Sequence, residues 1–236
     1  MTKYWFVKIV NDINYILFPR VCFGCNTQLF RGEYLLCTVC RNDLPITEYN
    51  FQENNEIDRI FYGRIPVVKA STFLFFSQNG IVKQLLHHLK YKNQEVIGDY
   101  FGNWYGELLK KQGDLKEIDI IIPVPLHPNK LKKRGYNQVE KFGKQIAKHI
   151  DAVFLKDALV KTADTKTLTQ KNRFNRWQST KELYVITNST ILENKNILLI
   201  DDVITTGATI EACGSALLKA KGTLLYVLSL AFVPEY

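Results

Sequence analysis

The stretch ILLIDDVITTGAT, from Ile197 to Thr209, predicts the fold of the chain and the place of its site. It begins with four apolar residues, and a continuous apolar run is typical of a strand that is buried on both faces of a parallel sheet. Two carboxylates, Asp201 and Asp202, come directly after this run. Ligands bind at the carboxyl edge of open parallel sheets, so we expect this acidic pair to lie at a ligand-binding edge.

The rest of the stretch predicts an anion site. Its loop offers hydroxyls, backbone amides and a glycine that allows a tight turn; the residues are Thr205, Thr206, Gly207, Ala208 and Thr209. A helix is expected to follow, and the amides at a helix N-terminus favour anions. Carboxylates suited to a diol therefore stand beside a loop suited to a phosphate, and a ribose 5-phosphate carries both groups.

Three other interpretations of a strand followed by Asp-Asp compete with this one. A Walker B strand would need a G-x-x-x-x-G-K-[ST] loop, which the chain lacks. The acidic pocket of a receiver domain opens its domain, whereas only residues 203–236 follow Asp202. An ordinary strand with solvated carboxylates does not account for the Thr/Gly loop directly after it.

Length, charge and hydropathy limit the class of protein. A chain of 236 residues with 46% hydrophobic residues suits one α/β domain with a small module. No uncharged apolar run reaches the roughly 18 residues of a membrane span. Lys3, Lys8 and Asp12 interrupt the apolar N-terminus, so we expect no signal peptide. The net charge of +8 favours phosphates, pyrophosphate or nucleic acid as partners.

Four of the five cysteines form two C-x-x-C pairs, eleven residues apart, and predict a structural metal site. Two such turns that face each other close a tetrahedral four-thiolate site, which zinc prefers. Accidental pairs of core cysteines are a weaker explanation because the segment is too small for its own core, and a redox pair lacks a βαβ context. The expected zinc ligands are Cys22, Cys25, Cys37 and Cys40.

Hydrophobic periodicity predicts alternating strands and helices after this module. Residues 47–64 show no clear period and are expected to form a linker or a peripheral excursion. We expect three segments: 1–46 with an N-terminal helix and the zinc module, 47–78 with a linker and the first strand, and 79–236 with the main domain. Strands are expected at residues 67–76, 118–125, 158–161, 183–186, 197–200 and 224–233, and helices at 4–18, 81–89, 96–109, 138–150 and 210–221.

Two basic stretches lie upstream of the acidic pair. Residues 127–136 predict a loop between a strand and a helix capped by Asn137, and this loop is either a solvated basic turn or a pyrophosphate site. Its place one βα unit before the acidic pair favours pyrophosphate, with Leu126, Lys132, Lys133 and Arg134 as the candidate contacts. Within the polar and basic residues 162–181, Lys171 and Arg173 are candidate catalytic residues of a loop that closes over the site.

Residues 197–209 resemble the phosphoribosyl pyrophosphate (PRPP) motif of type I phosphoribosyltransferases. Together with the four-cysteine module, I-I-P-V-P-L and R-G-Y-N-Q, they make the chain similar to the ComF family of competence-associated proteins. The resemblance implies a type I phosphoribosyltransferase-like α/β fold, a parallel sheet flanked by helices, behind a small zinc-ribbon-like module. It also implies that Asp201 and Asp202 hold the ribose hydroxyls, that residues 205–209 hold the 5-phosphate, and that Mg²⁺ accompanies PRPP.

For function, the resemblance implies a cytoplasmic role in handling incoming single-stranded DNA during natural transformation. The implied partners are a helicase-like competence ATPase and recombination proteins. Three alternatives stay open from the sequence: a phosphoribosyltransferase with an unidentified acceptor, a non-catalytic nucleic-acid-binding module, and a non-catalytic PRPP-sensing adaptor in a protein complex.

Overall fold

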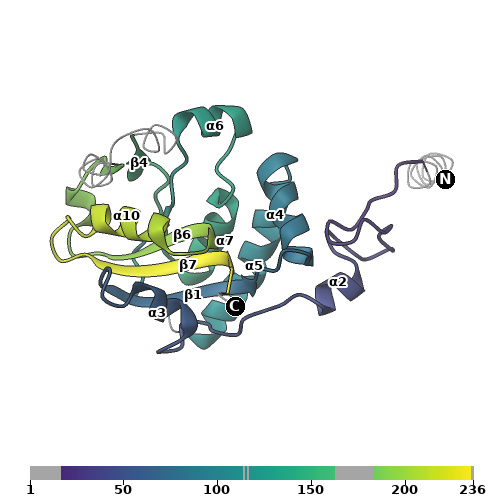
Figure 1. Ribbon diagram of the computed structural model, residues 1–236, viewed down its shortest axis with the longest axis horizontal. Helices are drawn as coiled ribbons and strands as arrows, with labels where there is room; N and C mark the ends of the chain where they lie inside the picture. Colours follow the sequence, from purple (N-terminus) through teal and green to yellow (C-terminus); the bar gives the residue numbers. More distant parts are fainter. Residues whose placement is uncertain (1–16, 114, 116, 163–182, 235–236) are drawn as a thin grey trace, which may run out of the picture.

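The computed structural model describes residues 17–113, 115, 117–162 and 183–234 (Figure 1). Its main feature is a five-stranded sheet in the order β1-β7-β6-β2-β3, in which every pair of neighbours is parallel. The strands are β1 (Val67–Phe75), β2 (Ile120–Pro123), β3 (Val153–Phe154), β6 (Asn196–Ile204) and β7 (Leu224–Phe232). A separate antiparallel ribbon pairs β4 (Leu159–Lys161) with β5 (Tyr184–Ile186). The predicted parallel α/β sheet is therefore confirmed.

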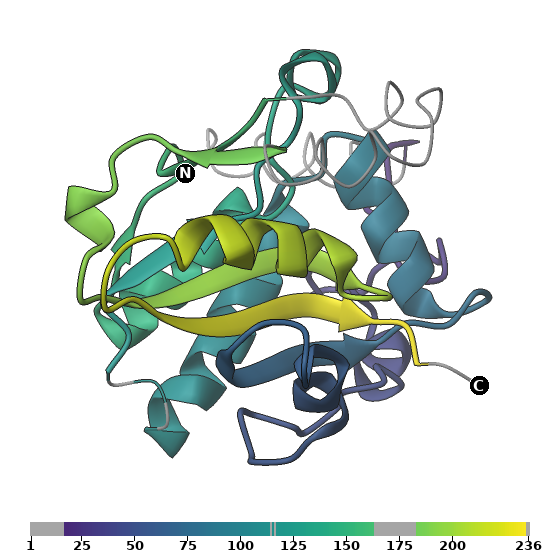
Figure 2. The same ribbon diagram turned by 60° about the vertical axis from the view of Figure 1, so that its left-hand side comes forward.

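Helices cover both faces of the sheet (Figures 1 and 2). On one face lie α4 (Ile81–Tyr91), α5 (Val96–Gln112) and α7 (Glu140–Ile150), and on the other lies α10 (Ala208–Leu217). The central strand β6 contributes side chains to the core on both faces of the sheet. Leu198 and Ile200 pack with α4, α5 and α7, whereas Ile197 and Leu199 pack with α10. The run Ile197–Ile200 within β6 is therefore buried on both faces, as its continuous apolar sequence predicts.

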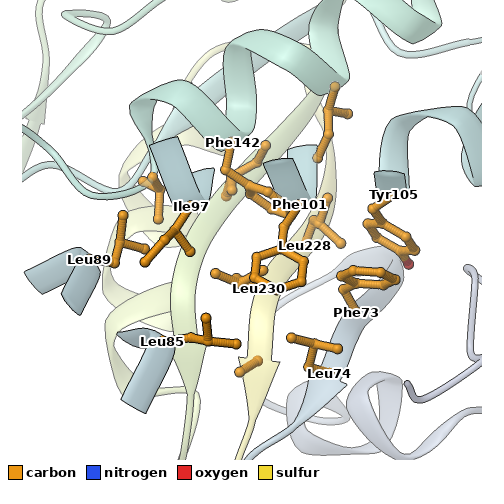
Figure 3. Close-up of a cluster of buried hydrophobic side chains, with 14 of the residues drawn as sticks. Phe73, Leu74, Leu85, Leu89, Ile97, Phe101, Tyr105, Phe142, Leu228 and Leu230 are labelled. Carbon is orange, nitrogen blue, oxygen red and sulfur yellow. The ribbon is translucent and has the colours of Figure 1, made fainter. Parts of the chain in front are cut away.

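The larger core lies between the sheet and α4, α5 and α7 (Figure 3). Phe73 of β1 stacks on Tyr105 of α5, with ring centroids 4.6 Å apart, and meets Phe101 edge to face. The helices α5 and α7 approach closely because Gly102 has no side chain; a Cβ there would lie 2.6 Å from the Phe142 carbonyl oxygen. Phe101 and Tyr105 of α5 are thus part of the core.

The N-terminal module contains the four cysteines and the short helix α2 (Thr38–Asn42). It packs against α4: the Phe23 ring lies 4.9 Å from the ring of His88, and a Cβ on Gly24 would lie 2.9 Å from Ile81 Cγ2. The module therefore supports the helix that leads to the carboxyl edge of the sheet. The segment boundaries at residues 46 and 78 stay a prediction, although β1 itself pairs with β7.

The expectation of a linker over residues 47–64 was wrong in part, because this segment contains α3 (Glu56–Phe61). Asn55 caps α3 by accepting hydrogen bonds from the amides of Ile57 and Asp58. Ile57 and Phe61 are buried next to β1. A helix of 6 residues is too short for a periodic pattern, which explains the error.

The expectation of a loop over residues 127–136 was also wrong, because Pro128–Arg134 forms helix α6. Pro128 occupies its first turn, His127 Nδ1 accepts from the Asn129 amide, and Gly135 ends it with φ 84°. The next helix begins at Glu140 rather than directly after Asn137. Asn137 instead caps a turn and donates to the Val124 carbonyl at 2.9 Å, which closes the excursion onto the end of β2.

Three further boundaries can be compared. The acidic pair lies inside β6, which runs on to Ile204 because β7 continues beside it to Phe232. The strands expected at residues 158–161 and 183–186 are present, and they pair with each other as an antiparallel ribbon. The helix expected at residues 4–18 and the basic stretch at 162–181 lie largely outside the described residues. Within the part that the structure describes, no helix has the length and hydropathy of a membrane span.

Candidate functional site

The site lies where the chain direction changes in the sheet. From β2 the chain passes through α6 and α7 to β3 on one side, and from β6 it passes through α10 to β7 on the other. The two connections cover opposite faces, so they leave a crevice between the carboxyl ends of β2 and β6. Ligands of open α/β sheets bind in such a crevice.

The two strands differ in length at this crevice. Pro123, the last residue of β2, pairs with Ile200, and the Val124 amide still donates to the Ile200 carbonyl at 2.8 Å. Beyond this point β2 leaves the sheet, while β6 continues through residues 201–204 with only β7 beside it. The acidic pair therefore lies in the part of β6 that pairs with β7 on one side and no longer pairs with β2 on the other.

Asp201 and Asp202 point to opposite faces of β6, as successive strand residues do. Asp202 Oδ2 lies 2.9 Å from Nζ of Lys90, at the end of α4. Asp201 faces α10, where burial and then the charge of Asp201 raise the pKa of Cys213 well above its usual value. The two residues are also joined, because Asp201 Oδ1 accepts a hydrogen bond of 2.8 Å from the Asp202 backbone amide.

Asp202 Oδ2 is buried and has no hydrogen-bond partner among the described residues. Its contact with Lys90 is an ion pair by distance, but the ammonium is not aligned for a hydrogen bond. Buried carboxylate oxygens nearly always have partners, and an exception calls for a ligand, an ion or a water. The donor set thus fits a hydroxyl group or a hard cation such as Mg²⁺, which binds oxygen ligands.

Asp201 is held in an environment that opposes its charge. Burial, followed by the Asp202 carboxylate, raises the pKa of Asp201 to about 7, while the more distant Lys90 and Lys161 act in the other direction. Burying two carboxylates side by side costs stability. Such an arrangement is typical of functional sites.

The loop between β6 and α10 is open to solvent on one side. Thr205, Thr206, Ala208 and Thr209 are exposed, and the amides of residues 206–210 have no acceptor among the residues that the structure describes. Gly207 has φ 72°, and a Cβ there would lie 2.7 Å from Ile60 Cγ2. Only glycine fits this turn, which aims free amides and hydroxyls outward as an anion site requires.

A pocket of about 500 Å³ adjoins this loop, and sequence reasoning missed its basic residues. Arg64 donates to the Thr206 carbonyl at 2.6 Å and pairs with Glu211 of α10, so it braces the loop from behind. Arg59 lines the same pocket. Both arginines belong to the segment expected to be a linker. In the sequence they are isolated charges without a motif, so nothing there marks them as site residues. The lining residues are Glu56, Arg59, Ile60, Arg64, Thr205, Thr206 and Phe232.

The basic residues expected to hold pyrophosphate lie on α6 and at its end. Lys132 and Lys133 are exposed, whereas Leu126 and Arg134 are half-buried. Arg134 contacts Gln138 and places its guanidinium 5.8 Å from the centre of the Tyr91 ring. Arg134 is thus held by neighbouring side chains, and the role of these residues at a pyrophosphate stays a prediction.

The last turn of α4 links these predicted groups. Lys90 contacts Asp202, its neighbour Tyr91 supports Arg134, and the Leu89 carbonyl accepts from the Tyr136 hydroxyl. Sequence reasoning did not single out Lys90, because a cation in the last turn is an ordinary helix stop signal. Lys171 and Arg173, the candidate closing residues, lie outside the described residues.

The four cysteines come together as predicted. The sulfur atoms of Cys22, Cys25, Cys37 and Cys40 all lie within 4.8 Å of one another. Cys25 and Cys37 have their sulfurs 3.8 Å apart. A tetrahedron with metal–sulfur bonds of about 2.3 Å has edges of about 3.8 Å, so this group can bind a metal such as zinc. Amides donate to two of these sulfurs, as expected around thiolate ligands.

Comparisons with known proteins agree with this geometry. Residues 140–232 match the phosphoribosyl transferase domain family, so this part of the chain has a phosphoribosyltransferase-like fold. The matched region contains β6, the acidic pair and the Thr/Gly loop. It does not include the cysteine module, for which the relatives of the whole chain are more informative.

Three relatives align with a larger part of the chain. The chain is 30% identical over 145 residues to competence protein ComFC of Streptococcus pneumoniae, covering 61% of this chain and 60% of the relative. It is 24% identical over 214 residues to ComFC of Bacillus subtilis, covering 91% and 84%. It is 23% identical over 216 residues to DNA utilization protein YhgH of Shigella flexneri, covering 85% and 92%. The chain is thus similar to competence and DNA utilization proteins of several species, and the first alignment spans less than two thirds of that relative's length.

Proposed function

We propose that this protein binds PRPP with Mg²⁺ in the crevice between β2 and β6, and that it acts through this site in the uptake and use of DNA. The observation that carries the binding proposal is the buried Asp202 Oδ2 without a hydrogen-bond partner. It stands at the switch point of the sheet, beside a loop with free amides. A sugar with a diol and a 5-phosphate supplies partners for both.

The geometry suggests how the ligand would be divided among the protein's groups. Residues 205–209 would take the 5-phosphate on their amides and hydroxyls. Asp202 would accept a ribose hydroxyl, and Asp201 would fix the Asp202 backbone through its hydrogen bond to that amide. The pyrophosphate would lie toward α6. Its candidate contacts are Leu126, Lys132, Lys133 and Arg134.

Mg²⁺ would neutralise charge on the pyrophosphate when bound, and Asp202 is the residue whose free oxygen faces it or the sugar. In phosphoribosyl transfer, the bond from C1 of the ribose to pyrophosphate breaks and positive charge builds on the ring. Nearby carboxylates stabilise that charge. Lys171 and Arg173 are our candidates for a loop that excludes water over the site. Phosphoribosyl transfer to an acceptor and PRPP sensing without turnover would use the same binding site. An assay of pyrophosphate release distinguishes these two functions, because only transfer releases pyrophosphate.

The role in DNA uptake is supported by the relatives, whose names refer to competence and to DNA utilization. The net charge of +8 suits a partner with a phosphate backbone. We therefore propose a cytoplasmic protein that handles single-stranded DNA together with a helicase-like ATPase and recombination proteins. Zinc at the four cysteines would be structural, since a site closed by four thiolates has no open position for chemistry.

Isothermal titration calorimetry with PRPP, with and without Mg²⁺, tests the binding proposal. We expect Mg²⁺-dependent binding to the unmodified protein and a loss of at least about tenfold in Asp202→Asn, because a hydrogen bond to a charged group contributes roughly 1.5–3 kcal/mol. Asp157→Asn is the matched control, since its side chain is exposed and makes no ion pair with the described residues. Equal affinities for PRPP in the two variants would rule out the site.

A specific observation also favours direct binding of single-stranded DNA, because the exposed Lys132 and Lys133 extend the positive charge beyond the crevice. Fluorescence anisotropy with a labelled oligonucleotide should show affinity that falls steeply with salt. Affinity that is absent, or that does not change with salt, would remove this part of the proposal.

A further inference from the structure

Among the residues that the structure describes, Lys90 forms an ion pair with Asp202 of the acidic pair. It lies in the last turn of α4, with its Nζ 2.9 Å from Asp202 Oδ2 and its side chain 25% exposed. The carboxylate it meets is only 9% exposed. A buried carboxylate needs a compensating charge, and in the ligand-free protein Lys90 is the group that supplies it.

The contact between these groups is incomplete. The ammonium compensates charge, but it leaves Asp202 Oδ2 without a hydrogen bond. A lysine ammonium carries three donors on a flexible stem, so a well-formed pair would normally align one of them. The Lys90 ammonium therefore occupies the place beside Asp202 Oδ2 that a ribose hydroxyl or a metal ion would fill in the proposed complex.

The helix end that carries Lys90 is itself fixed. The Leu89 carbonyl accepts from the Tyr136 hydroxyl, and the Tyr91 ring supports the guanidinium of Arg134. The two neighbours of Lys90 in the chain thus contact the segment expected to hold pyrophosphate. The stem of a lysine is flexible, so the ammonium can change partners while the helix stays in place.

We propose that Lys90 is a positioning residue that holds the cation position beside Asp202 in the free protein and moves to the diphosphate of the ligand when the metal complex binds. This inference rests on the proposed function and adds an order of events to it. The metal alone would be kept out of the acidic pair, because it would have to displace an ammonium that meets no other anion among the described residues. A ligand that brings both a metal and a diphosphate supplies partners for Asp202 and Lys90 together.

Manganese binding tests whether Lys90 holds the cation position, without any need for turnover or for PRPP, and PRPP binding then tests the move to the diphosphate. We would titrate Mn²⁺ into the zinc-loaded full-length chain and measure free Mn²⁺ by electron paramagnetic resonance. The variant is Lys90→Met, which keeps the length of the side chain and removes its charge. The matched control is Lys83→Met, on the same helix, where the lysine is exposed and makes no ion pair with the residues described. Lys90→Arg keeps the charge and tests for a structural effect.

We expect Lys90→Met to bind Mn²⁺ alone at least about tenfold more tightly than the unmodified protein, because the competing cation is gone. The same variant should bind PRPP with Mg²⁺ several-fold more weakly, because the diphosphate loses a cation. Lys83→Met should match the unmodified protein in both measurements, and Lys90→Arg should not gain Mn²⁺ affinity. A merely structural role for Lys90 would weaken both kinds of binding, so opposite changes identify the exchange.

Equal Mn²⁺ affinity in Lys90→Met and Lys83→Met would overturn the proposal, provided that circular dichroism shows both to be folded. If Lys90→Met is unfolded, the comparison passes to Lys90→Gln by the same measurement. Failure of PRPP binding in the unmodified protein would contradict the proposed function, whereas the Mn²⁺ result would still decide whether Lys90 holds the cation position.

Discussion

Replacing Asp201 by asparagine should make the protein more stable at neutral pH. Burial and the adjacent Asp202 carboxylate raise the pKa of Asp201 from 3.8 to about 7. The folded state therefore binds a proton more tightly than the unfolded chain, and the free energy of unfolding falls as pH rises from about 4 to about 7. Asparagine carries no charge to bury. It keeps an oxygen that can accept from the Asp202 amide.

The size of the effect follows from the same values. A rise in pKa from 3.8 to about 7 corresponds to roughly 4 kcal/mol of opposed ionisation. Part of this is shared with Asp202, so we expect Asp201→Asn to gain about 2 kcal/mol at pH 7.5 and almost nothing at pH 4. In a chain of this size the gain corresponds to a rise in Tm of roughly 4–8 °C at pH 7.5.

Urea unfolding at pH 4, 5.5 and 7.5, followed by circular dichroism, measures the difference between the variant and the unmodified protein. Because both carry the same cysteine module, its own pH dependence cancels in the comparison. Asp157→Asn, at an exposed position, should show no such gain. If Asp201→Asn were equally or less stable at pH 7.5, or if its advantage did not grow with pH, the acidic pair would not be a buried charged site.

Three further predictions concern the loop, the cysteine module and the zinc. Gly207→Ala should lower the free energy of unfolding by roughly 2–4 kcal/mol and weaken PRPP binding, because the new side chain combines a positive φ with a clash at Ile60. Urea unfolding measures the first effect and calorimetry the second. The control Gly63→Ala, which has a positive φ but open space around it, should lower the free energy of unfolding by less. Gly24→Ala should lower zinc content, measured by atomic absorption, because its Cβ would lie 2.9 Å from Cys40 Sγ; an unchanged zinc content would contradict this packing. Removal of zinc by a chelator should lower Tm and weaken PRPP binding, since the module packs on α4, and unchanged affinity for PRPP would show that this support is unnecessary.

The parts of the fold with a strong local signal could be predicted from the sequence. The apolar run Ile197–Ile200 predicted a buried strand, and two C-x-x-C pairs predicted a four-sulfur cluster. Both signals are carried by residues that are close together in the chain. The same holds for the amphipathic pattern of α4, whose apolar face is buried.

The missed parts depend on contacts between distant segments. Helix α3 has only 6 residues and is stabilised by a cap and by burial against β1, neither of which a periodic pattern reveals. The length of β6 beyond the acidic pair is set by β7, its neighbour in the sheet.

Residues that complete the site were missed for the same reason. Lys90 meets Asp202 only because α4 ends above the crevice, and Arg64 braces the Thr/Gly loop from 142 residues earlier in the chain. Each is an ordinary surface cation in the sequence. The carboxylates and the loop could be predicted because they are contiguous, whereas their counter-ions are brought to them by the fold.

A crystal structure with PRPP and Mg²⁺ tests the central claim most directly. The account predicts the 5-phosphate within hydrogen-bond distance of the amides of residues 206–209. It predicts a ribose hydroxyl or Mg²⁺ at Asp202 Oδ2, with Lys90 turned toward the diphosphate. Ligand bound elsewhere on the molecule, with the contact between Lys90 and Asp202 intact, would contradict it.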